Sequence, residues 1–361
     1  MPSSVSDVVT YLRHMVEGGA SDLHLKPGLP PVVRIDGELE HTPFDTLTPS
    51  DTEAAARELL PPSLAADFQD RNEADVGYTV PGVGRFRVNV YRQRGVMNVA
   101  IRRVRPDIPT FDELHLPPAV AELAREQRGL VLVTGPAGTG KTTTIAAMIG
   151  WINANRRAHI VTIEDPIEIV HEDLSSVVDQ REVGLDTDSY RTALRYVVRQ
   201  DPDVVFIGEV RDMETVEAAM QAAETGHLVI ATLHTLDATE TVNRMIDLFP
   251  PETQRQVRVS LATSLRGVIS QRLVPRSDGK GRVPAVEVLI NTGRVAERII
   301  APEETSSIPD VMEDGDFYGM QTFDQSLLGL VRERLVTEDA AVGAASNPHD
   351  FRLAIKAAQL A

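Results

Sequence analysis

The sequence predicts an α/β fold of two domains, in which a small α+β domain precedes a larger domain built on a parallel sheet. Among the first hundred residues, short strand patterns flank Asp36-Gly37, a dipeptide typical of a two-residue hairpin turn. Further along, the apolar run at residues 130–133 lacks alternation, as expected for a strand buried on both faces. A glycine-rich loop and then a helical pattern follow this run. Strand-then-helix units are therefore expected in the second domain.

The first domain is expected at residues 1–105. Its opening helix is indicated by apolar residues at helical spacing, namely Val8, Val9, Leu12, Met15 and Val16, and Gly18 with Gly19 ends it. Strands are expected at residues 22–25, 32–35, 38–40, 85–90 and 96–104, and an Ala-rich helix at residues 51–68. A linker is expected at residues 106–113, because proline disfavours helix before it and cannot donate in a sheet.

The second domain is expected at residues 114–361. Its core strands are expected at residues 130–133, 160–163, 204–207 and 228–232. The last hundred residues are expected to be mostly helical, with one helix face formed by Val257, Leu261, Leu265 and Val268.

Composition excludes several classes of function. The chain has 361 residues, which is enough for two domains with separate cores. Its formal net charge of −17 argues against a general nucleic-acid binder, so no nucleic-acid partner is expected. The absence of cysteine excludes disulfides, thiol catalysis and Cys-ligated metal sites. The sequence has no signal-peptide pattern and no long apolar run, so we expect a cytoplasmic protein that could dock peripherally on a membrane complex.

A phosphate-binding loop is the strongest chemical signal. Gly135-Pro136-Ala137-Gly138-Thr139-Gly140-Lys141-Thr142 matches G-x-x-x-x-G-K-[ST] directly after the expected strand, and Thr143 continues the segment into a helix. Glycines let successive backbone N–H groups face phosphates. Lys141 is expected to neutralise phosphate charge, and the Thr142 hydroxyl to ligate Mg²⁺. The sequence therefore predicts a nucleotide triphosphatase.

Acidic residues near strand ends are candidates for holding Mg²⁺ and orienting water. Glu209 follows the strand at residues 204–207, although Gly208 stands where many P-loop enzymes carry Asp. Glu168 ends an acidic segment in which Pro166 breaks the preceding strand. An exposed acidic loop is the alternative for that segment. His227 and His234 bracket another strand, and either could be purely structural.

Seven arginines and no acidic residue lie between Gly84 and Arg105, in a chain that is otherwise acidic. Three interpretations remain open from the residues alone: a solvated strand face, a nucleic-acid surface, or a set of contacts to the phosphates of a nucleotide on a neighbouring subunit. Only Phe86 and Tyr91 supply aromatic rings here, which weakens the case for binding of single strands.

The ordered motifs resemble those of the secretion-type ATPase superfamily, and more closely its type IV pilus retraction (PilT, twitching motility) branch. The resemblance covers nearly the whole chain. The matching segments are residues 19–25, 85–89, the P-loop, the Asp box at 162–168, the Walker B segment at 204–209, the His box at 225–235 and a C-terminal segment at 319–324.

The resemblance implies a PAS-like N-terminal domain and a RecA-like ATPase domain, assembled as a homohexamer that binds ATP and Mg²⁺ between subunits. By position, Glu168 would activate water, Glu209 would be the Walker B acid near Mg²⁺, and His234 would sense the γ-phosphate. The arginines that reach ATP from the first domain would be Arg87 and Arg102. The partner implied is an inner-membrane pilus platform protein, which places the motor at the inner face of the cytoplasmic membrane.

The direction of pilus movement is a separate question. The helix needed for retraction in this branch often reads AIRNLIRE, whereas residues 293–300 read GRVAERII. Assembly motors usually carry a four-cysteine zinc subdomain and a long N-terminal extension, neither of which we expect here. Retraction is therefore favoured, with a pilus assembly or type II secretion ATPase as the alternative. A DNA-translocating ATPase and a non-hydrolysing regulatory partner are further alternatives.

Overall fold

The computed structural model of the chain describes residues 8–35, 37–104 and 108–360. The expected turn residue Asp36 and linker residues 106 and 107 lie outside this range, as do residues 1–7, 105 and 361. The chain divides into two compact units. The first unit comprises Met1–Asp107, Asp165–Val170 and Glu182–Thr187, and the second comprises Ile108–Glu164, His171–Arg181 and Asp188–Ala361. Two loop segments from the later chain therefore belong to the first unit.

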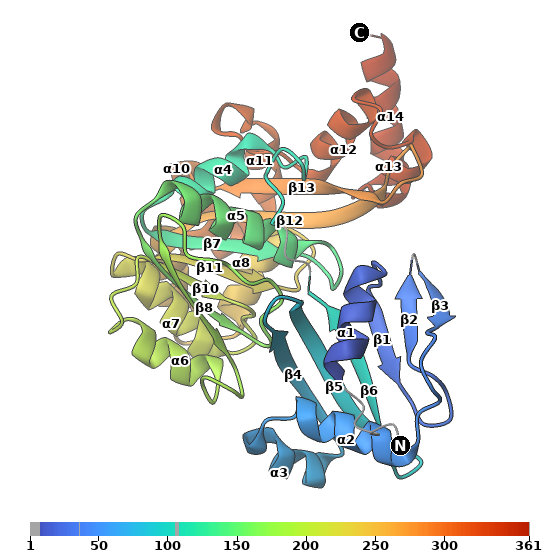
Figure 1. The fold of residues 1–361 in the computed structure, drawn as a ribbon. Coiled ribbons are helices and arrows are strands. Elements are labelled where there is room, and N and C mark those ends of the chain that lie inside the picture. Colours follow the sequence, from blue (N-terminus) through green and yellow to red (C-terminus); the bar gives the residue numbers. More distant parts are fainter. Residues whose placement is uncertain (1–7, 36, 105–107, 361) are drawn as a thin grey trace. The chain divides into compact units, whose positions relative to one another are not determined.

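The first unit is an antiparallel sheet with helices packed against it (Figure 1). Its strands are β1 (Asp22–Leu25), β2 (Val32–Ile35), β3 (Glu38–His41), β4 (Glu73–Val80), β5 (Gly84–Gln93) and β6 (Val96–Arg103). Among the described residues they pair in the order β3-β2-β1-β6-β5-β4. The alternation in β5 buries Phe86, Val88 and Val90 and places Arg85 and Arg87 on the other face.

The helices of the first unit are α1 (Val8–Glu17), α2 (Pro49–Leu59) and α3 (Pro62–Arg71). The expectation of one helix at residues 51–68 is wrong, because the chain leaves α2 at Leu60 in an extended conformation and Pro61 remains extended before α3 begins. Proline disfavours the helical conformation in the residue before it, so the pair Pro61-Pro62 separates the two helices. Strand β4 was not predicted from the sequence.

The second unit is a mixed sheet covered by helices on both faces. Its strands are β7 (Gly129–Thr134), β8 (His159–Glu164), β9 (Val177–Glu182), β10 (Val204–Ile207), β11 (Leu228–Leu233), β12 (Leu265–Pro275) and β13 (Arg282–Ile290). In the described chain they are ordered β13-β12-β7-β11-β10-β8-β9. β12, β7, β11, β10 and β8 are parallel, and β13 is antiparallel to β12.

Helices α4 (Pro118–Arg125) and α5 (Lys141–Asn155) pack on one face of this sheet, and α7 (Met213–Glu224) and α8 (Ala238–Asp247) on the other (Figure 1). α6 (Tyr190–Val197) packs beside α7, and α9 (Gln254–Ser264) contacts both α7 and α8. The inner strands are buried on both faces, which is why β7, β10 and β11 are almost entirely apolar.

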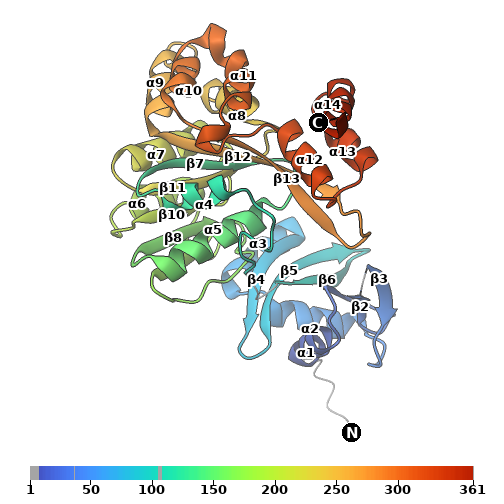
Figure 2. The same cartoon turned by 90° about the horizontal axis from the view of Figure 1, so that it is seen from above.

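The C-terminal part contains α10 (Gly293–Ile300), α11 (Ile308–Glu313), α12 (Phe323–Arg332), α13 (Glu338–Ala344) and α14 (Pro348–Leu360), with short 3-10 turns η1 (Pro302–Ser307) and η2 (Asp316–Tyr318). α12 to α14 gather at the far end of the β12–β13 hairpin (Figure 2), where Phe323, Phe351 and Val283 share a core. Among the described residues, no helix combines the length and apolarity needed to cross a bilayer.

One helix prediction in this region is wrong. Val257 and Leu261 lie on α9, but Leu265 and Val268 lie on β12. The helix ends where the chain joins the edge of β7, with a register shift between Leu265 and Gly267. A Cβ on Gly267 would lie 2.7 Å from the Leu289 carbonyl oxygen, so the close approach of β13 requires glycine there.

Candidate active site

The P-loop connects β7 to α5 in the second unit. Its three glycines all have positive φ, at 138° for Gly135, 78° for Gly138 and 91° for Gly140. A Cβ on Gly135 would lie 2.6 Å from the Gln271 carbonyl oxygen and 2.7 Å from Thr139 Oγ1. Glycine is thus required both for the backbone conformation and for space. The loop is solvent-accessible at residues 136–138.

The amino terminus of α5 lacks a side-chain cap, because Gly140 occupies the N-cap position. In contrast, α6, α7 and α8 are each capped by a side chain, from Ser189, Asp212 and Asp237 respectively. Uncapped N–H groups at a helix start, preceded by a glycine-rich turn, form a binding site for phosphate oxygens. The donor set therefore fits a nucleotide polyphosphate. The Thr142 hydroxyl beside it is half-buried and makes no hydrogen bond within the described chain, which leaves it able to ligate Mg²⁺.

Three of the expected site residues meet in the second unit. The Lys141 ammonium is buried and donates to the carbonyl oxygens of Gly135 at 2.5 Å and Pro136 at 3.0 Å. It also lies 3.5 Å from Nδ1 of His234. Nε2 of His234 lies 3.2 Å from Oε1 of Glu209. These partners place the imidazole proton on Nε2, so His234 bridges Lys141 and Glu209.

Glu209 is held ionised by its neighbours. Arg211 Nη2 donates to Glu209 Oε2 at 2.6 Å, and this hydrogen bond lowers the pKa of the Glu209 carboxyl despite its partial burial. An ionised carboxylate at the end of β10 is the oxygen ligand that Mg²⁺ prefers, directly or through water. Glu209 therefore fits the role of an acid near the metal.

Gly208, the atypical Walker B position, has a steric explanation. A Cβ at this residue would lie 2.8 Å from the Tyr190 hydroxyl, 3.1 Å from the Ile163 carbonyl oxygen and 3.3 Å from Glu164 Cα. Two of these neighbours are backbone atoms of β8 that cannot rotate away. A side chain at this position would therefore force its neighbours to shift, which favours glycine there.

Glu168 and Arg87 meet in the first unit. Arg87 Nη1 donates to Glu168 Oε1 at 2.5 Å, and both side chains are a little over one-third exposed. Arg102 faces Arg87 in the β5–β6 register, but its side chain pairs with Asp22 at 2.8 Å. The two expected arginines are thus neighbours on one sheet with different carboxylate partners.

The segment that carries Glu168 is fixed by a residue that sequence reasoning missed. Glu182 is buried, and its Oε2 accepts from Arg85 Nη2 at 2.6 Å and from the Ile167 N–H at 3.2 Å. Its Oε1 accepts from the Gly77 N–H at 3.1 Å. The carboxylate therefore joins β4, β5 and residues 165–170 within the first unit. The only local signal for this contact was the arginine-rich strand that contains Arg85. The partner of Arg85, Glu182, lies about a hundred residues later in the chain.

Other residues of the expected motifs have structural partners. His227 Nδ1 lies 2.9 Å from the Ala222 carbonyl oxygen at the end of α7. Arg92 lies over the Phe68 ring and also donates to the Gly95 carbonyl oxygen. In the C-terminal motif, Gln321 bonds to Val288 on β13 and Thr322 caps α12.

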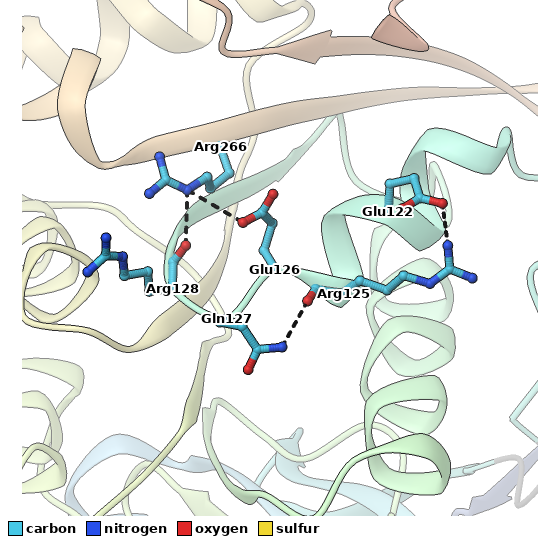
Figure 3. A pocket seen from close by; sticks show the side chains of 6 residues that line it. All are labelled: Glu122, Arg125, Glu126, Gln127, Arg128 and Arg266. Carbon is cyan, nitrogen blue, oxygen red and sulfur yellow. Dashed lines mark hydrogen bonds and ion pairs between the residues drawn. The ribbon is translucent and has the colours of Figure 1, made fainter.

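A pocket of about 330 Å³ lies away from the P-loop (Figure 3). Six residues line it, namely Glu122, Arg125, Glu126, Gln127, Arg128 and Arg266. It opens beside the first residue of β7, whereas the P-loop follows the last, roughly 17 Å along the strand. Figure 3 shows Arg266 bonded to Glu126 and to the Arg128 carbonyl oxygen within the pocket wall. This pocket is separate from the candidate nucleotide site.

Comparison with known proteins identifies the family. A family profile described as type II/IV secretion system protein matches residues 85–314. The type IV pilus ATPase PilU of Pseudomonas aeruginosa is 42% identical over 345 residues, which cover 96% of this chain and 90% of that protein. The type IV pilus retraction ATPase PilT of the same organism is 41% identical over 345 residues, covering 96% and 100%.

Among solved structures, the crystal structure of the pilus retraction motor PilT with bound ADP matches with a TM-score of 0.88 and 44% identity, covering 96% of this chain and 98% of that one. The predicted fold class and the resemblance read from the motifs are both confirmed by these matches. The chain belongs to the type II/IV secretion system protein family and has that family's α/β ATPase fold.

Proposed function

We propose that the protein is an ATP-hydrolysing motor that powers retraction of a type IV pilus. In this proposal it works as a homohexamer at the inner face of the cytoplasmic membrane and moves a membrane-embedded platform protein. Support comes from the similarity to PilT at 41% to 44% identity over nearly the full length of both chains. The observation that carries the proposal is the uncapped start of α5, with Lys141, His234 and Glu209 in one contact chain beside it.

The residues of the second unit would bind and orient MgATP. Backbone N–H groups at the start of α5 and the Lys141 ammonium would hold the β- and γ-phosphates. Thr142 and Glu209 would hold Mg²⁺, which when bound supplies charge neutralisation of the phosphates. His234 would donate to a γ-phosphate oxygen through Nε2, the atom that now faces Glu209. His234, directly after β11, would then gain a hydrogen bond when the γ-phosphate binds and lose it when phosphate is released.

The residues of the first unit would supply the base and the arginines. Glu168 would accept a proton from the attacking water, and Arg87 and Arg102 would stabilise the charge that develops on the phosphate. While Glu168 and Arg87 are paired, the carboxylate accepts a hydrogen bond from the guanidinium, and the two charges neutralise each other. We infer that turnover requires their separation, so that Arg87 exchanges the carboxylate for a phosphate of the neighbouring subunit's nucleotide.

Mixed rings test whether the site is shared between subunits. Lys141→Ala and Arg87→Ala proteins, each inactive alone, should regain a fraction of ATP turnover when mixed. This result is expected because an interface between the intact P-loop of one variant and the intact arginine of the other is complete. Mixtures that remain inactive, although the variants form rings together, would count against arginines acting in trans.

A genetic experiment tests the direction of pilus movement. Deletion of the gene should give hyperpiliated cells that do not move on surfaces, since assembled pili would no longer be withdrawn. Cells without pili would instead support the second candidate, an assembly motor. That candidate is kept because α10 reads GRVAERII and buries only Val295 and Ile299, with Ile300 left exposed.

A further inference from the structure

Glu287 is a buried acidic residue that the proposed reaction does not use. It lies on β13 with 9% of its surface exposed, and it has no ion-pair partner in the described chain. Its Oε1 accepts from the Ala238 N–H at 2.8 Å, at the start of α8. Ser270, its register partner on β12, faces it, and the Ser270 hydroxyl favours the ionised carboxylate. Burying a carboxyl this deeply costs folding free energy.

One route from Glu287 leads to the P-loop. Thr134 Oγ1 donates to Ser270 Oγ at 3.0 Å, and both side chains are fully buried. Ser270 lies opposite Glu287 in the β12–β13 register, so the three side chains follow one another across β7, β12 and β13. Thr134 is the last residue of β7, directly before Gly135. This relay of Glu287, Ser270 and Thr134 thus ends directly before the phosphate-binding turn.

A second route leads to His234. Glu287 accepts from Ala238, four residues after His234, while Asp237 caps the same helix start through the Glu240 N–H. Between them, Thr235 Oγ1 lies 2.7 Å from Thr241 Oγ1, which donates to the Asp237 carbonyl oxygen. The short segment between His234 and α8 is therefore tied to the helix start that Glu287 anchors.

Two charged groups face Glu287, Asp237 from α8 and Arg272 from β12. Burial raises the pKa of the Glu287 carboxyl to about 7, and the Asp237 charge adds to this effect. The Ala238 N–H and the Arg272 guanidinium oppose it; the guanidinium also donates to the Ala344 carbonyl oxygen and lies 3.8 Å from the centre of the Phe323 ring. Both protonation states are therefore accessible near neutral pH.

We propose that Glu287 is a positioning residue for ATP hydrolysis whose proton sets the hydrogen bonds that hold the P-loop strand and the His234 segment together. This proposal rests on the proposed ATPase function. In this proposal the ionised carboxylate only accepts, so the Ser270 hydroxyl, which accepts from Thr134, directs its own proton toward Glu287. A protonated carboxyl can donate to Ser270, which reverses the direction of the relay and makes Thr134 the acceptor.

The first test compares the pH dependence of kcat for wild type, Glu287→Gln and the matched surface control Glu252→Gln. Wild type and the control should show an inflection near pH 7. Glu287→Gln should show none, because its amide keeps an acceptor for Ala238 but cannot titrate. At pH 8 its kcat should be reduced about tenfold, as expected for misplaced catalytic groups. The KM for MgATP should change little. An unaltered profile and kcat in Glu287→Gln would overturn the proposal.

Ser270→Ala keeps the titrating carboxyl and removes the hydrogen bond that stabilises its ionised form. The inflection should therefore move to higher pH in this variant, which loss of structure alone would not produce. An inflection at the wild-type pH would contradict the relay. This variant also serves if Glu287→Gln fails to fold.

Hydrogen exchange separates the failure of this proposal from failure of the proposed function. In wild type, the protection factors of the amides of residues 235–241 should change across pH 7, with or without ATP hydrolysis. Glu287→Gln should abolish that change. If wild type shows the change but hydrolyses no ATP, the ATPase function fails and the coupling stands. Protection that is independent of pH in wild type would overturn the coupling.

Discussion

Arg87 Nη1 and Glu168 Oε1 lie 2.5 Å apart in the first unit, although 81 residues separate them in the chain. The motifs assign one to the phosphate charge and the other to the attacking water. If Arg87 and Glu168 have these proposed roles, the pair must separate before either group can act. The proposal therefore predicts a conformational step before hydrolysis.

Replacing Glu168 tests its proposed role as the base. Glu168→Gln should reduce ATP turnover at least about a hundredfold, the contribution typical of general base catalysis, while nucleotide binding persists. Steady-state phosphate release and fluorescent-nucleotide titration measure the two quantities. Glu172→Gln, an exposed acid four residues later, is the matched control and should remain active. Undiminished turnover in Glu168→Gln would refute the assignment of the base.

Removing the Glu182 carboxylate should destabilise the first unit. Glu182→Ala leaves the Arg85 guanidinium and the N–H groups of Gly77 and Ile167 without their shared acceptor. The expected cost is about 3 kcal/mol, as for a buried ion pair broken on one side. Differential scanning calorimetry measures it, and hydrogen exchange should show reduced protection at Ile167. An unchanged unfolding midpoint together with unchanged protection would show that the Glu182 carboxylate does not hold these groups together.

Gly208 should not tolerate a side chain. Gly208→Ala should lower stability by about 1 to 2 kcal/mol, because the new methyl crowds the Tyr190 hydroxyl and the β8 backbone. Tyr190→Phe in the same chain should recover part of that loss by removing the hydroxyl. Chemical denaturation of the two single variants and the double variant measures the coupling. Equal losses for Gly208→Ala in both backgrounds would show that the hydroxyl contact has no role.

Glu287 should make stability fall as pH rises. Its folded-state pKa, about 7, lies above the ordinary value of 4.5, so the folded chain binds more protons between these values. The contribution is fully present below about pH 4.5 and is lost as pH rises through about 7, with an upper limit on the order of 3 kcal/mol. Glu287→Gln should lack this slope in thermal midpoints measured from pH 5 to pH 8. Parallel slopes for the variant and wild type would disprove the shift.

The sequence predicted the parts whose signals are local. Strands β1, β2 and β10 have the predicted ends, because apolar alternation or an apolar run bounded by turn residues is contained in four residues. The P-loop was readable for the same reason. The break between α2 and α3 was also encoded locally, in Pro61-Pro62, and this signal was overlooked.

Long-range partners could not be predicted. Leu265 and Val268 continue a helical spacing, and only the pairing of β12 with β7 and β13 favours a strand there. Nothing near Glu182 or Glu287 in the sequence indicates that either carboxyl is buried. Their roles depend on groups from strands and helices that are distant in the chain, namely Arg85 and Gly77 for Glu182, and Ser270 and Ala238 for Glu287.

Steady-state ATP hydrolysis by the purified full-length protein with Mg²⁺ tests the central claim most directly. The wild-type chain should release phosphate continuously, and Lys141→Ala should release none, because the ammonium that faces the P-loop carbonyls and His234 is removed. A folded wild-type protein that binds MgATP but releases no more phosphate than Lys141→Ala would contradict the account, and would make the chain a nucleotide-binding protein without motor activity.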